Sequence, residues 1–409
     1  MSHVIIISIF VSLVFLYSLV SRRIDQSVIT APIFFTSAGI LLVFTVPGFS
    51  RPEIEQENFL KLAEIGLVML LFTDATHINL NALKCGPRLP PRLLSIGMLL
   101  TMLLGAIAAH IIFPDLSIWE VAILAVILAP TDAGLGQVIV KSPKVPSCIA
   151  RALDVEAGLN DGLSVPFLMF FIAVSQIGTE GSGRVLIKFI FEQLGMGALV
   201  GLVIGLVGGI LLGLAQRKGW MAESFQQLGL VSLPILGILA CEPVGGSMFI
   251  AAYIAGLFVQ IGFKSAGTHS LEFTEGWGQL LGYFIFFLCG LFVALAFERF
   301  RLIHILYAVL SLTVVRMVPV AIALMGTRLS SATMLFIGWF GPRGLASIVL
   351  GLVFLEEQVR LPGEETIKLA VMVTVMFSIF LHGFTALPGI DLYARKVATL
   401  DAMAPENMQ

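Results

Sequence analysis

The sequence predicts an all-α polytopic membrane protein with about thirteen transmembrane helices. Hydrophobic residues make up 58% of the 409 residues and charged residues only 12%, whereas soluble domains carry about 25% charged residues. The mean hydropathy is +1.00. Apolar runs recur from residue 3 to residue 389, which leaves no room for a large soluble domain.

Each apolar run of roughly 17–25 residues is interpreted as one transmembrane helix. The expected helices cover residues 3–20, 28–47, 57–77, 93–113, 118–139, 150–176, 186–215, 226–241, 246–263, 277–297, 302–325, 331–355 and 366–389. The runs 226–241 and 246–263 are short and separated only by Glu242-Pro243-Val244-Gly245, so one broken helix remains an alternative there.

Basic residues predict the orientation in the membrane. Arg22 and Arg23 follow the first apolar run, which indicates a retained first helix with its N-terminus outside rather than a cleaved signal peptide. Lys and Arg are then more frequent in the loops that face the cytoplasm. We therefore expect a multi-pass protein of the cell inner membrane, with a short cytoplasmic tail at 398–409.

Two expected helices are interrupted in their middle. The fifth contains Pro130 within ILAPTDAGLG, and the twelfth contains Gly341-Pro342 within IGWFGPRGLAS. Proline removes a backbone donor and breaks or kinks a helix. If helices 1–6 and 8–13 form two repeats, the breaks occupy the same slot in two six-helix repeats of inverted orientation. Matching interrupted helices in inverted halves indicate the binding site of a secondary transporter.

A further pattern lies in the seventh helix, where glycines recur every fourth residue and so line one face. This stripe favours either a sliding or subunit-contact surface or ordinary close helix packing. Its members are Gly197, Gly201, Gly205, Gly209 and Gly213.

Acidic residues at membrane depth define the candidate ion site. An acid inside an apolar helix is costly unless it is paired, hydrated or functional. Asp161 is the leading candidate, because a buried carboxyl can be neutralised by a proton or by a small cation, but not by both. Asp132 and Thr131 follow the break at Pro130 and add oxygen ligands. These oxygens suit sodium, while lithium and potassium remain open.

Four more polar residues are expected to support this site. Asn160 can orient Asp161, and Glu156 lies four residues before Asn160 on the same helix face. Arg316 and Arg343 lie inside apolar runs and need partners at depth. We pair Arg316 with Glu156, and we place Arg343 near the broken helix ends and Asp132.

Other polar residues are weaker candidates. Asp74 and His77 lie at the inner end of the third helix, where a pH-sensing role is an alternative to a simple interfacial position. His382 is interpreted as a packed or hydrogen-bonded helix residue. The four cysteines show no metal-ligand spacing, and hydrolase, zinc-protease and phosphate-loop motifs are absent. These observations argue against an enzyme, a resident cofactor and nucleic-acid binding.

The chain resembles the monovalent cation:proton antiporters, in the bacterial and archaeal sodium/proton exchanger branch. The resemblance is carried by Pro130-Thr131-Asp132, by Glu156 with Asn160-Asp161, by Arg316, and by Gly341-Pro342-Arg343-Gly344. It implies electroneutral exchange of one cation, most simply sodium, for one proton at Asp161, assisted by Asp132 and Thr131. It also implies an elevator-type transporter and a homodimer. Two departures, Ala133 and Ala157, occupy positions where proline and serine are common in the family, and Ala157 leaves the number of ion ligands open.

The resemblance also implies a division of the single transporter domain, residues 1–397. A core bundle is expected at about 93–176 and 302–389, a dimerisation part at about 1–92 and 226–297, and a linker helix at about 186–215. The alternatives to sodium/proton exchange are potassium/proton exchange, a sodium-coupled symporter of organic solutes, and a channel.

Overall fold

In the computed structural model, all regular secondary structure is helical in the residues that it describes, which are 3–24, 27–45, 56–77, 89–177, 190–263, 272–356, 361–400 and 404–407. Within these ranges, eight helices are long and apolar enough to cross a membrane: Val4–Ile24, Leu89–Ile112, Ser147–Ser175, Phe191–Arg217, Phe225–Val244, Gly276–Leu295, Leu302–Ala323 and Glu364–Val397. Shorter apolar helices cover Ala31–Thr45, Ile118–Ile127, Met248–Gly262 and Leu345–Leu355. The chain is therefore a polytopic, all-helical membrane protein.

In chain order the helices are α1 (His3–Ile24), α2 (Ala31–Thr45), α3 (Gln56–His77), α4 (Leu89–Arg92), α5 (Met98–Ile112), α6 (Ile118–Ile127), α7 (Ala133–Val140), α8 (Ser147–Ile177), α10 (Gly197–Arg217), α11 (Glu223–Cys241), α12 (Met248–Gly262), α13 (Glu272–Leu295), α14 (Leu302–Leu312), α15 (Val314–Ala323), α16 (Ser331–Trp339), α17 (Leu345–Glu356) and α18 (Glu364–Val397). Short π-helical segments, Leu93–Gly97 and Ile190–Met196, lead into α5 and α10.

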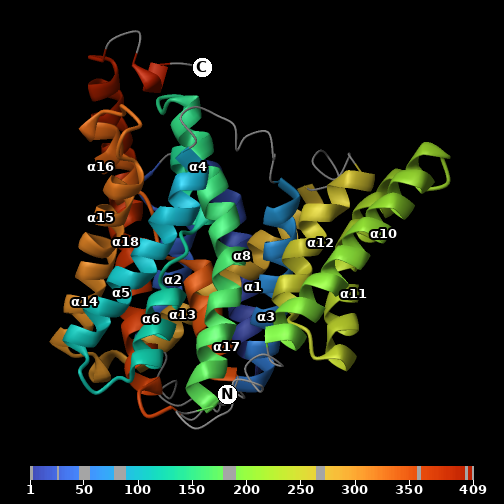
Figure 1. Ribbon diagram of the computed structural model, residues 1–409, viewed down its shortest axis with the longest axis horizontal. Helices are drawn as coiled ribbons and strands as arrows, with labels where there is room; N and C mark the ends of the chain where they lie inside the picture. Colours follow the sequence, from blue (N-terminus) through green and yellow to red (C-terminus); the bar gives the residue numbers. More distant parts are fainter. Residues whose placement is uncertain are drawn as a thin grey trace.

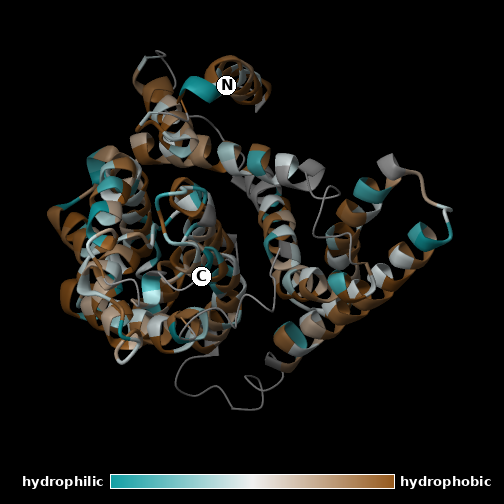
Figure 2. Cartoon of the chain, turned by 90° about the horizontal axis from the view of Figure 1, so that it is seen from above, coloured by the Kyte–Doolittle hydropathy of each residue, from teal (hydrophilic) through white to brown (hydrophobic). Residues whose placement is uncertain are grey.

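The helices form two groups that meet in the middle of the molecule. Figure 1 places α10, α11 and α12 at one edge and α14, α15, α16 and α18 at the other, with α3 and α13 between them. Figure 2 shows apolar residues on the outer surface of both groups. Phe15 on α1 and Leu199 on α10, for example, are more than half exposed. An apolar exterior of this kind suits contact with lipid rather than water.

The two helix breaks predicted from the sequence are both present. Helix α6 ends at Ile127 and α7 begins at Ala133, while α16 ends at Trp339 and α17 begins at Leu345. The intervening segments run without helix through the prolines, as expected for residues that lack a backbone donor. Non-helical backbone of this kind is tolerated at membrane depth only where it is buried in protein or lines a cavity.

Two further interruptions complete the comparison with the predicted helices. The segment around residue 243 separates two helices, α11 and α12, through a 3-10 turn at Glu242–Val244 and a left-handed Gly245 with φ 64°. Because α11 and α12 also pack against each other, they are two separate helices, and the alternative of one broken helix is wrong. A break between α14 and α15 at Thr313 was not predicted. It divides the expected helix 302–325, and α15 starts at Val314, two residues before Arg316.

The glycine stripe of α10 packs against the backbone of α12 in the same chain. A Cβ atom added at Gly205 would lie 2.5 Å from the carbonyl oxygen of Ala255, and one added at Gly197 would lie 2.8 Å from that of Ser247. Only glycine permits this approach along the whole stripe. Close helix packing within the chain therefore accounts for the pattern.

A carboxylate from the C-terminal segment closes the start of α16. Glu406 is 4% exposed, and its Oε1 accepts hydrogen bonds from the backbone N–H of Ser330 (2.7 Å) and from the hydroxyl of Thr333 (2.8 Å). That hydroxyl also lies 3.0 Å from the phenol oxygen of Tyr393 on α18. Ser330 caps α16 by accepting the N–H of Thr333 at 3.2 Å, and Glu406 holds this capping turn in place at the start of the helix that leads into the second break.

This cap predicts a pH-dependent loss of stability. Burial alone would raise the pKa of Glu406, but the hydrogen bonds from Ser330 and Thr333 outweigh it and hold the pKa below its ordinary value. The stabilisation is therefore complete above the unfolded pKa of about 4.3 and is lost as the pH falls through the folded pKa. We expect Glu406→Gln to melt about 2 °C lower than wild type at pH 7. Thermal melts in detergent should show the difference shrinking below about pH 4; a constant difference would contradict it.

Candidate ion-binding site

The two broken helices cross at Asp132. Its backbone N–H donates to the carbonyl oxygen of Pro342 in the other break, at 2.8 Å. Its carboxylate accepts the N–H of Leu135 at 2.8 Å and also the N–H of Leu345. These donors lie in the first turns of α7 and α17. One carboxylate therefore compensates the positive ends of two helices that point at the same spot.

Arg343 places its positive charge at the carbonyl groups that follow the C-terminal end of α6, on the other side of the first break from Asp132. Its guanidinium donates to the carbonyl oxygens of Ala129 and Pro130, the latter at 3.0 Å, and the whole residue is fully buried. The position near the broken helix ends is the predicted one. The predicted partner is different, because both carboxylate oxygens of Asp132 are taken by backbone donors and Arg343 binds carbonyl oxygens instead.

The glycines that flank Pro342 and Arg343 are explained by these contacts. A Cβ atom at Gly344 would collide with the carboxylate of Asp132, and a Cβ atom at Gly341 would lie 2.7 Å from Cζ of Arg316. Both side chains pass directly over the second break. In this sequence Pro342 interrupts the helix and Arg343 is the buried guanidinium. The two glycines leave room for the side chains of Arg316 and Asp132.

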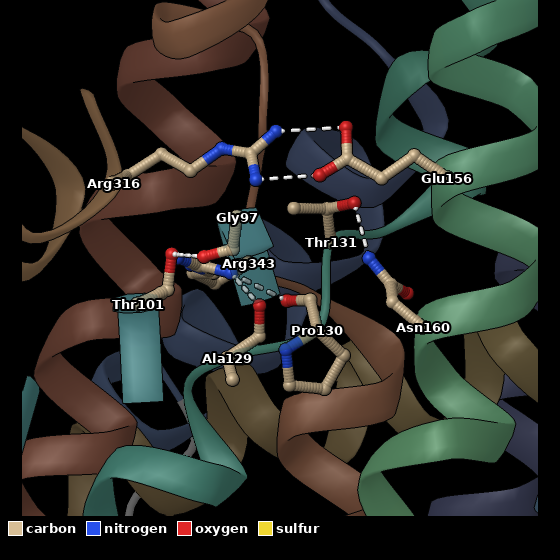
Figure 3. A network of polar contacts seen from close by, with 9 residues as sticks. All are labelled: Gly97, Thr101, Ala129, Pro130, Thr131, Glu156, Asn160, Arg316 and Arg343. Atoms are coloured by element: carbon tan, nitrogen blue, oxygen red, sulfur yellow. Dashed lines mark hydrogen bonds and ion pairs between the residues drawn. The ribbon is translucent and has the colours of Figure 1, made fainter. Parts of the chain in front are cut away.

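Glu156 on α8 and Arg316 on α15 form a buried, bidentate ion pair (Figure 3). The two hydrogen bonds measure 2.6 and 2.9 Å, and each side chain is only 3% exposed. The pairing predicted from the sequence is confirmed. Its geometry is that of the fork-to-fork contact that arginine makes best with a carboxylate. The pair links α8 to α15, and the side chain of Arg316 also lies over Gly341 in the second break.

Asn160 fixes the first break to α8. Its side-chain Nδ2 donates to Oγ1 of Thr131 at 2.7 Å, and both residues are buried (Figure 3). The hydroxyl oxygen of Thr131 thereby accepts a hydrogen bond. Asn160 does not bond Asp161 in this structure, so it orients the broken segment rather than the neighbouring carboxyl.

Asp161 is buried beside this network with a spare oxygen. It is 4% exposed, and no hydrogen-bond partner of its Oδ1 is found among the described residues. The Oδ1 of Asn160, the preceding residue, is likewise buried without a partner in the same part of the structure. Buried polar atoms are nearly always satisfied, so each exception requires an explanation. Two buried oxygens without a partner on consecutive residues fit a site that receives a proton or a cation.

Two residues from other helices lie near Asp161, and the sequence analysis placed neither of them at the site. Asp74 on α3 lies close enough to act electrostatically on Asp161, as does Asp132. Tyr253 on α12 packs against Gly162, where a Cβ atom would meet its ring at 2.5 Å. Asp161 therefore lies where α8 meets α3 and α12. The signal for Asp74 was present as an acid in an apolar run, but its position near a helix end favoured an interfacial interpretation.

The structure describes the side chain of His382 but not that of His77, the two histidines considered in the sequence analysis. His382 on α18 is buried, and its Nδ1 lies 3.1 Å from the hydroxyl of Ser378, which accepts the backbone N–H of Arg343 at 2.6 Å. It is a packed, hydrogen-bonded helix residue, as interpreted. The side chain of His77 lies outside what the structure describes.

Comparison with known proteins places this site in a family context. The family model described as "Sodium/hydrogen exchanger, transmembrane" matches residues 9–388. The K(+)/H(+) antiporter NhaP of Alkalimonas amylolytica is 26% identical over 360 residues, which are 84% of this chain and 59% of that protein. A sodium, potassium, lithium and rubidium/H(+) antiporter of Bacillus subtilis is 27% identical over 56% of this chain and 33% of its own length. The chain thus spans less than two thirds of the length of both relatives.

The fold has a solved counterpart. The sodium proton antiporter MjNhaP1 of Methanocaldococcus jannaschii superposes with a TM-score of 0.78 at 20% identity, covering 98% of this chain and 100% of that one. A second structure of the same antiporter, at pH 8, gives a TM-score of 0.70. Because the family model covers the broken helices, the buried ion pair and Asp161 alike, this chain belongs to the sodium/hydrogen exchanger family.

Proposed function

We propose that this chain exchanges a monovalent cation for a proton across the membrane, with Asp161 as the shared binding group. The observation that carries the proposal is the buried carboxyl oxygen of Asp161, which has no hydrogen-bond partner among the described residues. Burial disfavours a bare carboxylate, so the group is stable with a bound proton or with a bound cation. Because each displaces the other, one site carries both species in alternation.

The neighbours of Asp161 suit a small, hard cation. The hydroxyl of Thr131 offers an uncharged oxygen ligand. Asp132 contributes negative charge from a distance, because both of its oxygens already accept backbone N–H groups. In this proposal Asp161 binds the ion and Thr131 supplies a second oxygen ligand. Asp132 attracts the ion by its negative charge and does not coordinate it directly.

Alternating access requires that Asp161 face each side of the membrane in turn. Its position where α8 meets α3 and α12 supports a moving core, residues 93–176 and 302–389, that carries it past a dimerisation part, residues 1–92 and 226–297. Helix α10, within the expected linker at 186–215, packs on α12 of that part. The two breaks support two inverted repeats of six helices. We further propose a homodimer, with the N-terminus outside and the C-terminus in the cytoplasm.

Sodium is the first candidate ion, and potassium is the second. The relative named as a K(+)/H(+) antiporter favours potassium. Ala157, one helical turn from Asp161, also offers no hydroxyl to a small ion. A site with fewer direct ligands leaves more of the hydration shell on the cation, which lowers the advantage of sodium.

The test is exchange in proteoliposomes loaded with a pH-sensitive dye. Sodium, lithium and potassium are added in turn to acid-loaded vesicles, and we expect at least one of them to alkalinise the interior. If exchange is electroneutral, a membrane potential set with valinomycin leaves the sodium-driven rate unchanged. Flux that persists without a proton gradient at channel rates, or cation uptake that requires an organic solute, would replace the proposal by a channel or a symporter.

A further inference from the structure

A small cavity lies between the broken segment and α8. Its volume is about 10 Å³, near the lower limit for one water molecule. Thr131 and Asp132 line one end, Ala157 lines its side, and Asp154 lines it as well. Asp154 is exposed, whereas Thr131, Asp132 and Ala157 are buried. The cavity therefore joins an exposed carboxylate to two residues of the ion site.

Helix geometry puts Asp154 and Asp161 on the same face of α8. They are seven residues apart, which is close to two full turns and about 10 Å along the axis. Ala157 lies between them on that face and carries only a methyl group, so α8 places no large side chain between the two carboxylates at that position. Asp154 lies about two turns after the start of α8 at Ser147.

The proposed function gives Asp161, Asp132 and Thr131 roles, but none to Asp154. We propose that Asp154 is the entrance carboxylate of the cation route: it attracts the cation to the cavity mouth and so sets the cation concentration at which exchange is half-saturated. It acts as a positioning residue, without holding the ion in the bound state. A fixed negative charge at the mouth of a low-dielectric passage raises the local cation concentration.

The inference predicts a separation between apparent affinity and maximal rate. Asp154→Asn should raise the half-saturating cation concentration by about threefold at low ionic strength, as one unit charge does at about 10 Å in a partly aqueous medium. The maximal rate should stay within about twofold, because the chemistry at Asp161 is untouched. Added choline chloride should remove the difference, since salt screens a charge at this distance. Asp154→Glu should behave as wild type.

The matched control is Asp391→Asn. Asp391 on α18 is another exposed carboxylate, held by Lys144 of the turn between α7 and α8 at 2.6 Å, and it does not line the cavity. Its variant should keep the wild-type half-saturating concentration. An equal effect of both variants would mean a general surface-charge effect and would overturn the assignment.

Other outcomes also decide the matter. An unchanged half-saturating concentration in Asp154→Asn, a fall in maximal rate alone, or an effect that persists in high salt would each overturn the inference. The inference rests on the proposed exchange, and the two fail differently. If wild type exchanges no cation for protons, the proposed function falls. If wild type exchanges normally and Asp154→Asn matches it, only the role of Asp154 falls.

Discussion

Replacing Asp161 with asparagine abolishes cation-driven proton movement and leaves the fold intact. The amide has nearly the shape of the carboxyl group, but it can neither release a proton nor neutralise a cation. Because Asp161 is buried and makes none of the hydrogen bonds that hold the helix crossing, its loss costs little stability. Dye-loaded proteoliposomes of the variant should respond to sodium or potassium as protein-free vesicles do.

Two controls make this result interpretable. Thermal melts and size-exclusion profiles of Asp161→Asn should match those of wild type, which separates loss of transport from loss of fold. Asp391→Asn, at an exposed ion pair with Lys144, should transport normally. Exchange by Asp161→Asn above the protein-free background would refute the assignment of the shared site.

Breaking the ion pair of Glu156 and Arg316 has the largest expected effect on stability. Arg316→Ala leaves a buried carboxylate without its partner, and removing one member of a buried pair costs about 3–5 kcal/mol. It also empties the volume that the guanidinium fills over Gly341. We expect a strongly lowered melting temperature in detergent and little folded protein from membranes.

The double variant distinguishes charge from packing. Glu156→Gln combined with Arg316→Met removes both charges and keeps most of the volume, and replacing a whole buried pair by neutral groups is often neutral. The double variant should therefore melt well above Arg316→Ala. If it melts no higher, the pair matters through shape rather than through its buried charge, and the electrostatic explanation is wrong.

The sequence predicted the parts of this structure that break a strong rule. Pro130 and Pro342 violate helix continuity, and Glu156 and Arg316 violate the exclusion of charge from hydrocarbon. Each violation has few physical solutions, so the breaks and the pair could be predicted. The family followed from the same residues, because their order along the chain is specific.

The remaining features depend on three-dimensional contacts that no local pattern encodes. Asp132 accepts an N–H group from α17, which is more than two hundred residues away in the chain. Because the carboxylate oxygens of Asp132 accept backbone N–H groups, the guanidinium of Arg343 binds carbonyl oxygens instead. Asp74 was interpreted as an interfacial or pH-sensing residue rather than as part of the site, because its distance from Asp161 is set by how α3 packs, and apolar periodicity does not report helix packing.

The glycines on α10 show the same limit. Their spacing indicates a close helix contact, but a stripe has the same appearance whether its partner is α12, another subunit or a sliding surface. Only the proximity of the α12 backbone identifies the partner.

The most direct test of the central claim is to count the protons released when the cation binds at equilibrium. Purified protein in weakly buffered detergent solution is titrated with sodium or potassium while a pH indicator is read. If one carboxyl holds either species, wild type releases up to one proton for each cation bound, and Asp161→Asn releases none. Cation binding to wild type without proton release at any pH, or the same release from Asp161→Asn, would contradict it.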